Sequence, residues 1–177
     1  MHPIKHLKTI NEHRRLVRKY CFRLGLYRQG LVHDLSKYSP TEFWNGARYY
    51  RGNGSPIAAE RRDKGMSEAW LHHKGRNKHH TECWIDYKFE PDGTPGFGPL
   101  PMPKKYVAEM FCDHIAASRI YLGDKYTDAA PLAHYEKRKD HKMINPQTDE
   151  EFRKMLTVLK EEGEEAAFRY VRDWMKQ

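Results

Sequence analysis

Apolar residues recur at steps of three and four along most of this 177-residue chain, which is the spacing that lines up side chains on one face of an α-helix. Residues 4–23 carry one such series, which Gly25 ends, and residues 104–122 carry another, which Gly123 ends. No segment shows a sustained alternation of period two, the pattern typical of a half-buried strand. The sequence therefore predicts an all-α fold.

Helix start signals divide the rest of the chain. Ser39 before Pro40 predicts a helix start in which Glu42 closes a capping box, and Thr148 with Glu151 forms a second capping box that opens the last helix. We expect further helices at 27–36, 40–50, 55–65, 67–75 and 131–140.

Two segments carry more specific expectations. A helix at 27–36 would turn Leu31, Val32 and Leu35 inward, because these residues form its apolar positions. Residues 90–103 hold five Pro and three Gly, and this composition predicts an irregular loop.

The length suits a single domain around one hydrophobic core, with 124–177 as a C-terminal helical extension that packs on the bundle and bends at Gly163. The three cysteines, Cys21, Cys83 and Cys112, are an odd number without a Cys-x-x-Cys motif, which favours a reducing compartment. No run approaches the roughly 18 apolar residues that span a bilayer, and the N-terminus lacks an apolar run of signal-peptide length. We expect a soluble, cytoplasmic protein.

The adjacent pair His33 and Asp34, with Lys37 three residues later, is the strongest functional signal. Such a pair brings an imidazole nitrogen and a carboxylate oxygen close together, so a divalent metal can bind both, and the two oxygens of Asp34 can bridge two ions. His13 lies upstream, and Asp113 stands in the apolar stretch of 104–122. Since an inward carboxylate is costly unless it is paired or metal-bound, Asp113 is also a candidate ligand.

A dense histidine cluster follows, with His72, His73, His79 and His80 within nine residues. Members seven residues apart on a continuous helix would be about 10 Å apart, too far to bind one ion. Either Gly75 breaks the helix and folds the second pair back, or one pair binds metal while the other contacts substrate or supports the ligands. Trp70 and Leu71 mark the buried side of this helix, and His73 is the preferred ligand because it comes three residues after Trp70. A basic surface patch is the alternative.

Positive charge is concentrated in the part of the chain that holds most of these candidates. The net charge is +8, and residues 1–80 carry 17 Lys and Arg against 6 Asp and Glu. A positive field around a metal site would attract anionic substrates such as phosphate esters or nucleotides. Lys37, Arg76, Lys78 and Arg119 are the candidate substrate-binding residues, with a solvated basic surface as the alternative for each.

The order His13, His33-Asp34 and Asp113, with Lys37 after the pair, resembles the HD-domain superfamily of metal-dependent phosphohydrolases across roughly residues 10–120, including a bacterial and phage branch of it. The resemblance implies a single-domain HD-like helical bundle that holds a metal with these four ligands. Members with an additional His pair bind two ions. The matching positions in this chain are His73 and one of His79 or His80, and His114 stands where the superfamily often has Arg.

Together these features predict an enzyme, a metal-dependent phosphohydrolase with one or two divalent transition ions (Mn, Fe, Co, Ni or Zn). It would act on a nucleotide or other small phosphate ester through a metal-activated water, with Asp34 and Lys37 in catalytic roles. One alternative is an HD-type di-iron oxygenase. Another is a non-catalytic protein that binds nucleic acid through basic residues of its first helix (Arg14, Arg15, Arg18 and Lys19). A membrane partner is not expected, and the substrate, the metal and a homo-oligomeric state stay open.

Overall fold

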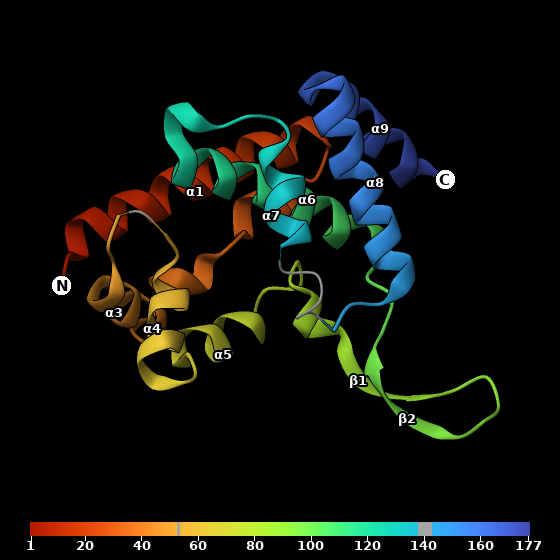
Figure 1. Ribbon diagram of the computed structural model, residues 1–177, viewed down its shortest axis with the longest axis horizontal. Helices are drawn as coiled ribbons and strands as arrows, with labels where there is room; N and C mark the ends of the chain where they lie inside the picture. Colours follow the sequence, from red (N-terminus) through yellow and green to blue (C-terminus); the bar gives the residue numbers. More distant parts are fainter. Residues whose placement is uncertain (53, 138–142) are drawn as a thin grey trace.

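The computed structural model describes residues 1–52, 54–137 and 143–177 (Figure 1). Helices dominate these residues, which confirms the predicted mainly α-helical class. The α-helices are α1 (Pro3–Arg23), α2 (Tyr27–Val32), α3 (Pro40–Tyr49), α4 (Pro56–Lys64), α5 (Glu68–Lys74), α6 (Lys104–Leu122), α7 (Ala130–Glu136), α8 (Pro146–Glu162) and α9 (Glu164–Lys176). Short 3-10 turns lie at η1 (Leu35–Tyr38), η2 (Thr81–Trp84) and η3 (Gly123–Lys125).

Helices α1 and α6 pack together through the middle of the molecule, with α8 and α9 at one end and α3, α4 and α5 at the other (Figure 1). One cluster of buried apolar side chains joins α1, α6, α8 and α9, and it includes Val17, Phe111, Leu156 and Phe168. Each large side chain in such a core contributes about 1.5–3 kcal/mol by its burial. The C-terminal helices therefore share their core with α1 and α6, which leaves other positions of these two helices to carry polar side chains toward α2 and α5.

The prediction of an irregular loop at 90–103 is wrong for part of this segment. Strands β1 (Ile85–Phe89) and β2 (Pro95–Pro99) form an antiparallel hairpin that extends away from the helices, as Figure 1 shows. Tyr87 pairs with Phe97 across the hairpin, with ring centroids 5.2 Å apart. Proline is compatible with this strand because each strand of a two-stranded ribbon has an edge without a hydrogen-bonded neighbour.

The segment 27–36 also differs from its prediction. Helix α2 ends at Val32, and Leu31, Val32 and Leu35 remain about half exposed, at 55%, 49% and 50%. The buried residue of α2 is Gly30, where an added Cβ would lie 3.0 Å from the Cβ of Cys21. Because α2 packs on α1 through this glycine, its larger apolar side chains point outward.

The structure differs from the predicted start of α8 and from the predicted helix at 131–140. Asn145, rather than Thr148, caps α8, because its side chain accepts from the backbone N–H groups of Gln147 and Thr148. Thr148 lies inside the helix, and its hydroxyl accepts a hydrogen bond from the backbone N–H of Met102 at 3.0 Å. Helix α7 ends at Glu136, and positions 138–140 of the helix predicted at 131–140 lie outside the described residues.

The bend predicted at Gly163 is a break between α8 and α9, where this glycine has φ +84°. No helix of the described residues combines the length and apolarity needed to cross a membrane.

Candidate metal centre

Three parts of the fold supply the first group of candidate ligands. His13 comes from α1, Asp113 from α6, and His33 and Asp34 from the turn between α2 and η1. Nε2 of His13 lies 3.0 Å from Oδ1 of Asp113 and 3.3 Å from Nε2 of His33, which in turn lies 3.3 Å from Oδ2 of Asp34. Ligand atoms of a tetrahedral metal site with bonds of about 2.0–2.2 Å lie roughly 3.3–3.6 Å apart. These four residues, called the first ligand group below, therefore have the spacing of a metal site.

The backbone at Asp34 is unusual and aims its carboxylate at the centre. Asp34 has φ +54°, in the left-handed region, and no other non-glycine residue of the described chain has a positive φ. Such a conformation costs on the order of 1–3 kcal/mol and persists where its surroundings hold it. Arg14 supplies part of that hold, because it donates to the carbonyls of His33 at 2.7 Å and Leu31 at 3.0 Å.

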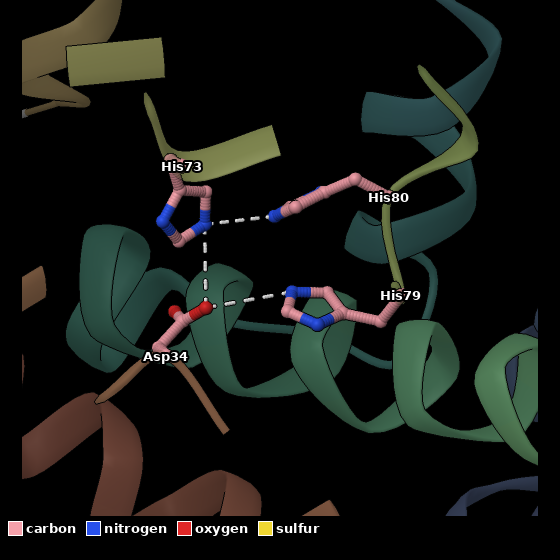
Figure 2. A group of neighbouring side chains, drawn as sticks. All are labelled: Asp34, His73, His79 and His80. Atoms are coloured by element: carbon pink, nitrogen blue, oxygen red, sulfur yellow. Dashed lines mark hydrogen bonds and ion pairs between the residues drawn. The ribbon is translucent and has the colours of Figure 1, made fainter. Parts of the chain in front are cut away.

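A second ligand group lies on the other side of the same carboxylate. Figure 2 shows His73 and His79 directed at Asp34, and His80 directed at His73. Oδ1 of Asp34 lies 3.2 Å from Nε2 of His73 and 3.6 Å from Nε2 of His79. Nε2 of His80 lies 2.9 Å from Nε2 of His73. Asp34 thus belongs to both groups, with one oxygen turned toward each.

The end of α5 brings histidines seven residues apart into one group. The helix ends at Lys74 with Gly75 as its C-cap, and the chain then turns back. Asn77 fixes this turn, since its side-chain nitrogen donates to the carbonyl of His73 at 2.8 Å and to the hydroxyl of Ser36 at 2.8 Å. Of the two arrangements that the sequence left open, the helix break is the one observed.

Two buried glutamates hold the far side of the histidine rings. Oε1 of Glu109, on α6, lies 2.8 Å from Nδ1 of His33 and 3.2 Å from Nδ1 of His79. Glu42, on α3, lies 2.7 Å from Nδ1 of His73. A carboxylate can only accept, so these Nδ1 atoms carry hydrogen, and in the neutral form of each ring the Nε2 atom then has a lone pair toward the centre. Histidines that ligate metals are oriented in this way.

Charge interactions keep the acids of the centre ionised. Burial would raise the pKa of Asp34, but His33 and Lys37 hold that pKa well below its ordinary value. Burial would lower the pKa of His33, but Asp34 and Asp113 raise it well above the ordinary range. Burial and the neighbouring histidines lower the pKa of His80. The centre therefore collects negative charge that protons on histidine balance, and a divalent cation can take over that role.

Two buried polar atoms without hydrogen-bond partners show whether these residues fit a metal ion. Oδ1 of Asp34 and Nε2 of His79 have no hydrogen-bond partner among the described residues, although they lie only 3.6 Å apart. Two buried acceptors that face each other without a donor are costly. A cation between them would satisfy both. Imidazole nitrogens with carboxylate oxygens also suit transition metals, so these groups can hold a metal ion.

Comparison with known proteins identifies the family of this chain. A family model matches residues 2–158, a span that contains every member of both ligand groups. The chain belongs to DUF5662. This is described as a family of unknown function. No curated protein and no solved structure matches the chain.

In this member of DUF5662, the predicted substrate-binding residues have different surroundings. Arg76 and Lys78 are exposed, and Arg76 donates to the backbone carbonyl of His72 at 3.1 Å. Arg119 forms an ion pair with Glu164 at 2.7 Å, because its position on α6 faces α9. The expectation that Arg119 reaches the centre is therefore wrong. Lys37 does reach it, with Nζ 2.5 Å from Oδ2 of Asp34.

Sequence reasoning missed both glutamates of this centre, Glu42 and Glu109. Glu42 was expected to close a capping box, but its carboxylate contacts His72 at 2.6 Å and His73 instead, while Ser39 still accepts from its backbone N–H. Glu109 carried a usable signal, since it stands in an apolar stretch four residues before Asp113 and thus on the same helix face. A second carboxylate on one inward face is best explained by a polar site.

Proposed function

We propose that the protein is a phosphohydrolase with a two-metal centre that acts on a small phosphate ester such as a nucleotide. The observation that carries this proposal is the placement of Asp34, whose Oδ2 faces the first ligand group and whose Oδ1 faces the second. A carboxylate placed in this way bridges two ions. Divalent ions bound there would generate a hydroxide nucleophile near neutral pH and offset charge on the phosphoryl oxygens.

The resemblance to the HD-domain superfamily supports the same proposal. The residues that carry the resemblance, His13, His33, Asp34 and Asp113, are the first ligand group. The second group contains His73 with both His79 and His80, although only one of the last two was expected. Successive positions of this pattern are up to 79 residues apart in the chain, yet they lie together in the structure. This agreement supports a metal centre of the type found in the HD-domain superfamily.

Substrate can approach the centre from the side of Asp113 and Lys37. The side chains of His33, Asp34 and His73 are at most 2% exposed, whereas Asp113 is 16% and Lys37 is 27% exposed. The side with Asp113 and Lys37 is therefore one that a phosphate group can reach. Lys37 would meet that group with its ammonium, and it would offset negative charge as the transition state forms.

A cleft of about 290 Å³ lies beside this approach. Thr9, one helical turn before His13, and Tyr121, two turns after Asp113, are among its lining residues. Lys5 and Lys8 also line it. The lining also includes Glu12 and a second tyrosine, Tyr50. Because the two lysines outnumber the one glutamate and two aromatic side chains are present, the cleft suits the remainder of an anionic, ring-containing substrate such as a nucleotide.

Metal content is the first test. We expect protein purified without added metal to contain about two equivalents of a transition ion, as in other two-metal centres. Asp34→Ala should lose them, whereas Asp173→Ala, an exposed carboxylate on α9, should keep them. Chelation should lower the Tm of wild type and Asp173→Ala only, since a ligand at a hundred times its Kd stabilises by about 2.7 kcal/mol.

Loaded protein would then be assayed with nucleoside monophosphates and p-nitrophenyl phosphate in Mn, Co, Ni or Zn. Phosphate release that Asp34→Ala abolishes would support the proposal. A wild-type protein that binds none of these ions, or that binds them and releases no phosphate, would contradict it.

A di-iron oxygenase is the second candidate, and the second ligand group is compatible with it. Three imidazoles, from His73, His79 and His80, form a nitrogen-rich set that suits iron as well as zinc or nickel. Iron at about two equivalents, together with substrate-dependent oxygen uptake, would favour the oxygenase over the hydrolase. The nucleic-acid alternative loses part of its basis, because Arg14 is engaged with the backbone at His33.

A further inference from the structure

Glu109 is a buried carboxylate at the boundary of the two ligand groups. It lies on α6, one turn before Asp113, and is only 5% exposed. Its Oε1 is the atom that contacts both His33 and His79, at 2.8 Å and 3.2 Å. The two rings stack on each other, with centroids 4.4 Å apart and an interplanar angle of 35°. One oxygen therefore fixes two rings at once.

The two rings belong to different ligand groups. Nε2 of His33 faces Oδ2 of Asp34 in the first group, and Nε2 of His79 faces Oδ1 of Asp34 in the second. A movement of Glu109 would displace one ligand in each group. The centre thus has two shared elements, Asp34 between the ions and Glu109 behind the histidines.

Glu42 provides a contrast within the same fold. It is also 5% exposed, and it also contacts two histidines through Nδ1, His72 and His73. Of these, only His73 is a ligand candidate, and it belongs to the second group. The two glutamates therefore have similar burial and chemistry but differ in how many ligand groups they reach.

We propose that Glu109 is a positioning residue that couples the two metal positions, so that an ion in one position strengthens binding at the other. The inference rests on the proposed two-metal centre. An ion on His33 draws electron density from the ring, which strengthens the hydrogen bond from its Nδ1 to Glu109. The fixed carboxylate then holds His79 with its lone pair toward the second position. The second ion consequently meets ligands that are already ordered.

The test measures metal affinity by calorimetric titration with Co²⁺, and the visible absorption of bound Co²⁺ reports each position. Asp113→Asn leaves the second group intact, and His80→Ala leaves the first group intact. In both backgrounds we expect Glu109→Met to weaken Co²⁺ binding by about 10–100-fold, the usual effect of losing a group that orients a metal ligand. Glu42→Met should weaken binding only where the second group remains. In the otherwise wild-type chain, Glu109→Met should also abolish cooperativity between the two ions.

The outcomes separate this inference from the proposed function. Wild type that binds two Co²⁺ ions, with Glu109→Met weakening one position only or neither, overturns the coupling and leaves the two-metal centre standing. Wild type that binds a single ion or none overturns both. Circular dichroism checks that each variant folds. If Glu109→Met does not fold, Glu109→Gln keeps the shape and removes the charge, and weaker binding at both positions is again the expected result.

Discussion

The ammonium of Lys37 lies 2.5 Å from Oδ2 of Asp34, the oxygen that also faces His13 and His33. Burial would lower the pKa of Lys37, but Asp34 and Asp113 raise it, so the side chain carries its charge across the physiological range. A protonated amine has no lone pair for a metal. Lys37 therefore adds positive charge beside the ligands without being one of them.

This relationship predicts different effects of Lys37 on metal binding and on catalysis. We expect Lys37→Met to retain its metal and to lower kcat by roughly 10²–10³-fold, as for other groups that stabilise transition-state charge. Elemental analysis and steady-state kinetics would measure the two effects. Lys176→Met, an exposed lysine on α9, is the matched control. Loss of metal from Lys37→Met would instead assign this lysine to assembly of the centre.

The cleft lysines should act on substrate capture. Lys5 and Lys8 line the cleft beside Thr9, outside both ligand groups. We expect the double reversal Lys5→Glu with Lys8→Glu to raise KM by about tenfold and leave kcat unchanged, because the local field steers an anionic substrate. The effect should shrink as salt is added. Lys160→Glu, exposed on α8, should leave KM unaffected, and an equal effect there would show that net charge alone is responsible.

The sequence predicted elements whose local signals agree with their packing. Helices α1 and α6 follow the apolar spacing closely, and the break at Gly163 was visible as a helix bend. The hairpin was missed because the segment containing Pro95 and Pro99 reads as a breaker-rich loop. Its cross-strand pair, Tyr87 with Phe97, depends on a register that no local pattern specifies.

The ligands could be nominated from sequence, but their arrangement could not. His33 and Asp34 were placed on a helix, whereas they lie in a turn with a left-handed backbone at Asp34, beside which Arg14 donates to the carbonyl of His33. Residue type alone did not separate Lys37, which contacts the centre, from Arg119, which pairs with α9. That distinction depends on the helix face and on which helix packs there, and both are tertiary properties.

Gly46 is predicted to be required where α3 packs on α1. A Cβ at this position would lie 2.2 Å from Nε2 of His6, whose side chain is buried. We expect Gly46→Ala to lose about 1–3 kcal/mol of unfolding free energy, since overpacking displaces well-ordered side chains. Urea denaturation would measure this. Gly54→Ala, where a Cβ meets no atom within 4 Å, should be nearly neutral, and equal losses in the two variants would rule out the packing explanation.

Glu164 is predicted to make stability depend on pH through its contacts with Arg23 and Arg119. Burial would raise the pKa of Glu164, but the two arginines lower it below its ordinary 4.5. The folded state therefore gains stability from the ionised carboxylate above about pH 4.5, and it loses that gain as pH falls through the lowered pKa. We expect Glu164→Gln to cost about 1 kcal/mol at pH 7 and progressively less in acid.

The neighbouring Glu165 is the control for that measurement. It also pairs with Arg23, at 2.8 Å, but its side chain is 81% exposed, so solvent screens the interaction. The unfolding free energies of wild type, Glu164→Gln and Glu165→Gln would be measured from pH 7 down to about pH 3. The difference between wild type and Glu164→Gln should shrink as the pH falls, whereas Glu165→Gln should stay close to wild type at every pH. A difference between wild type and Glu164→Gln that persists unchanged in acid would mean that shape, rather than charge, anchors α9 to α1 and α6.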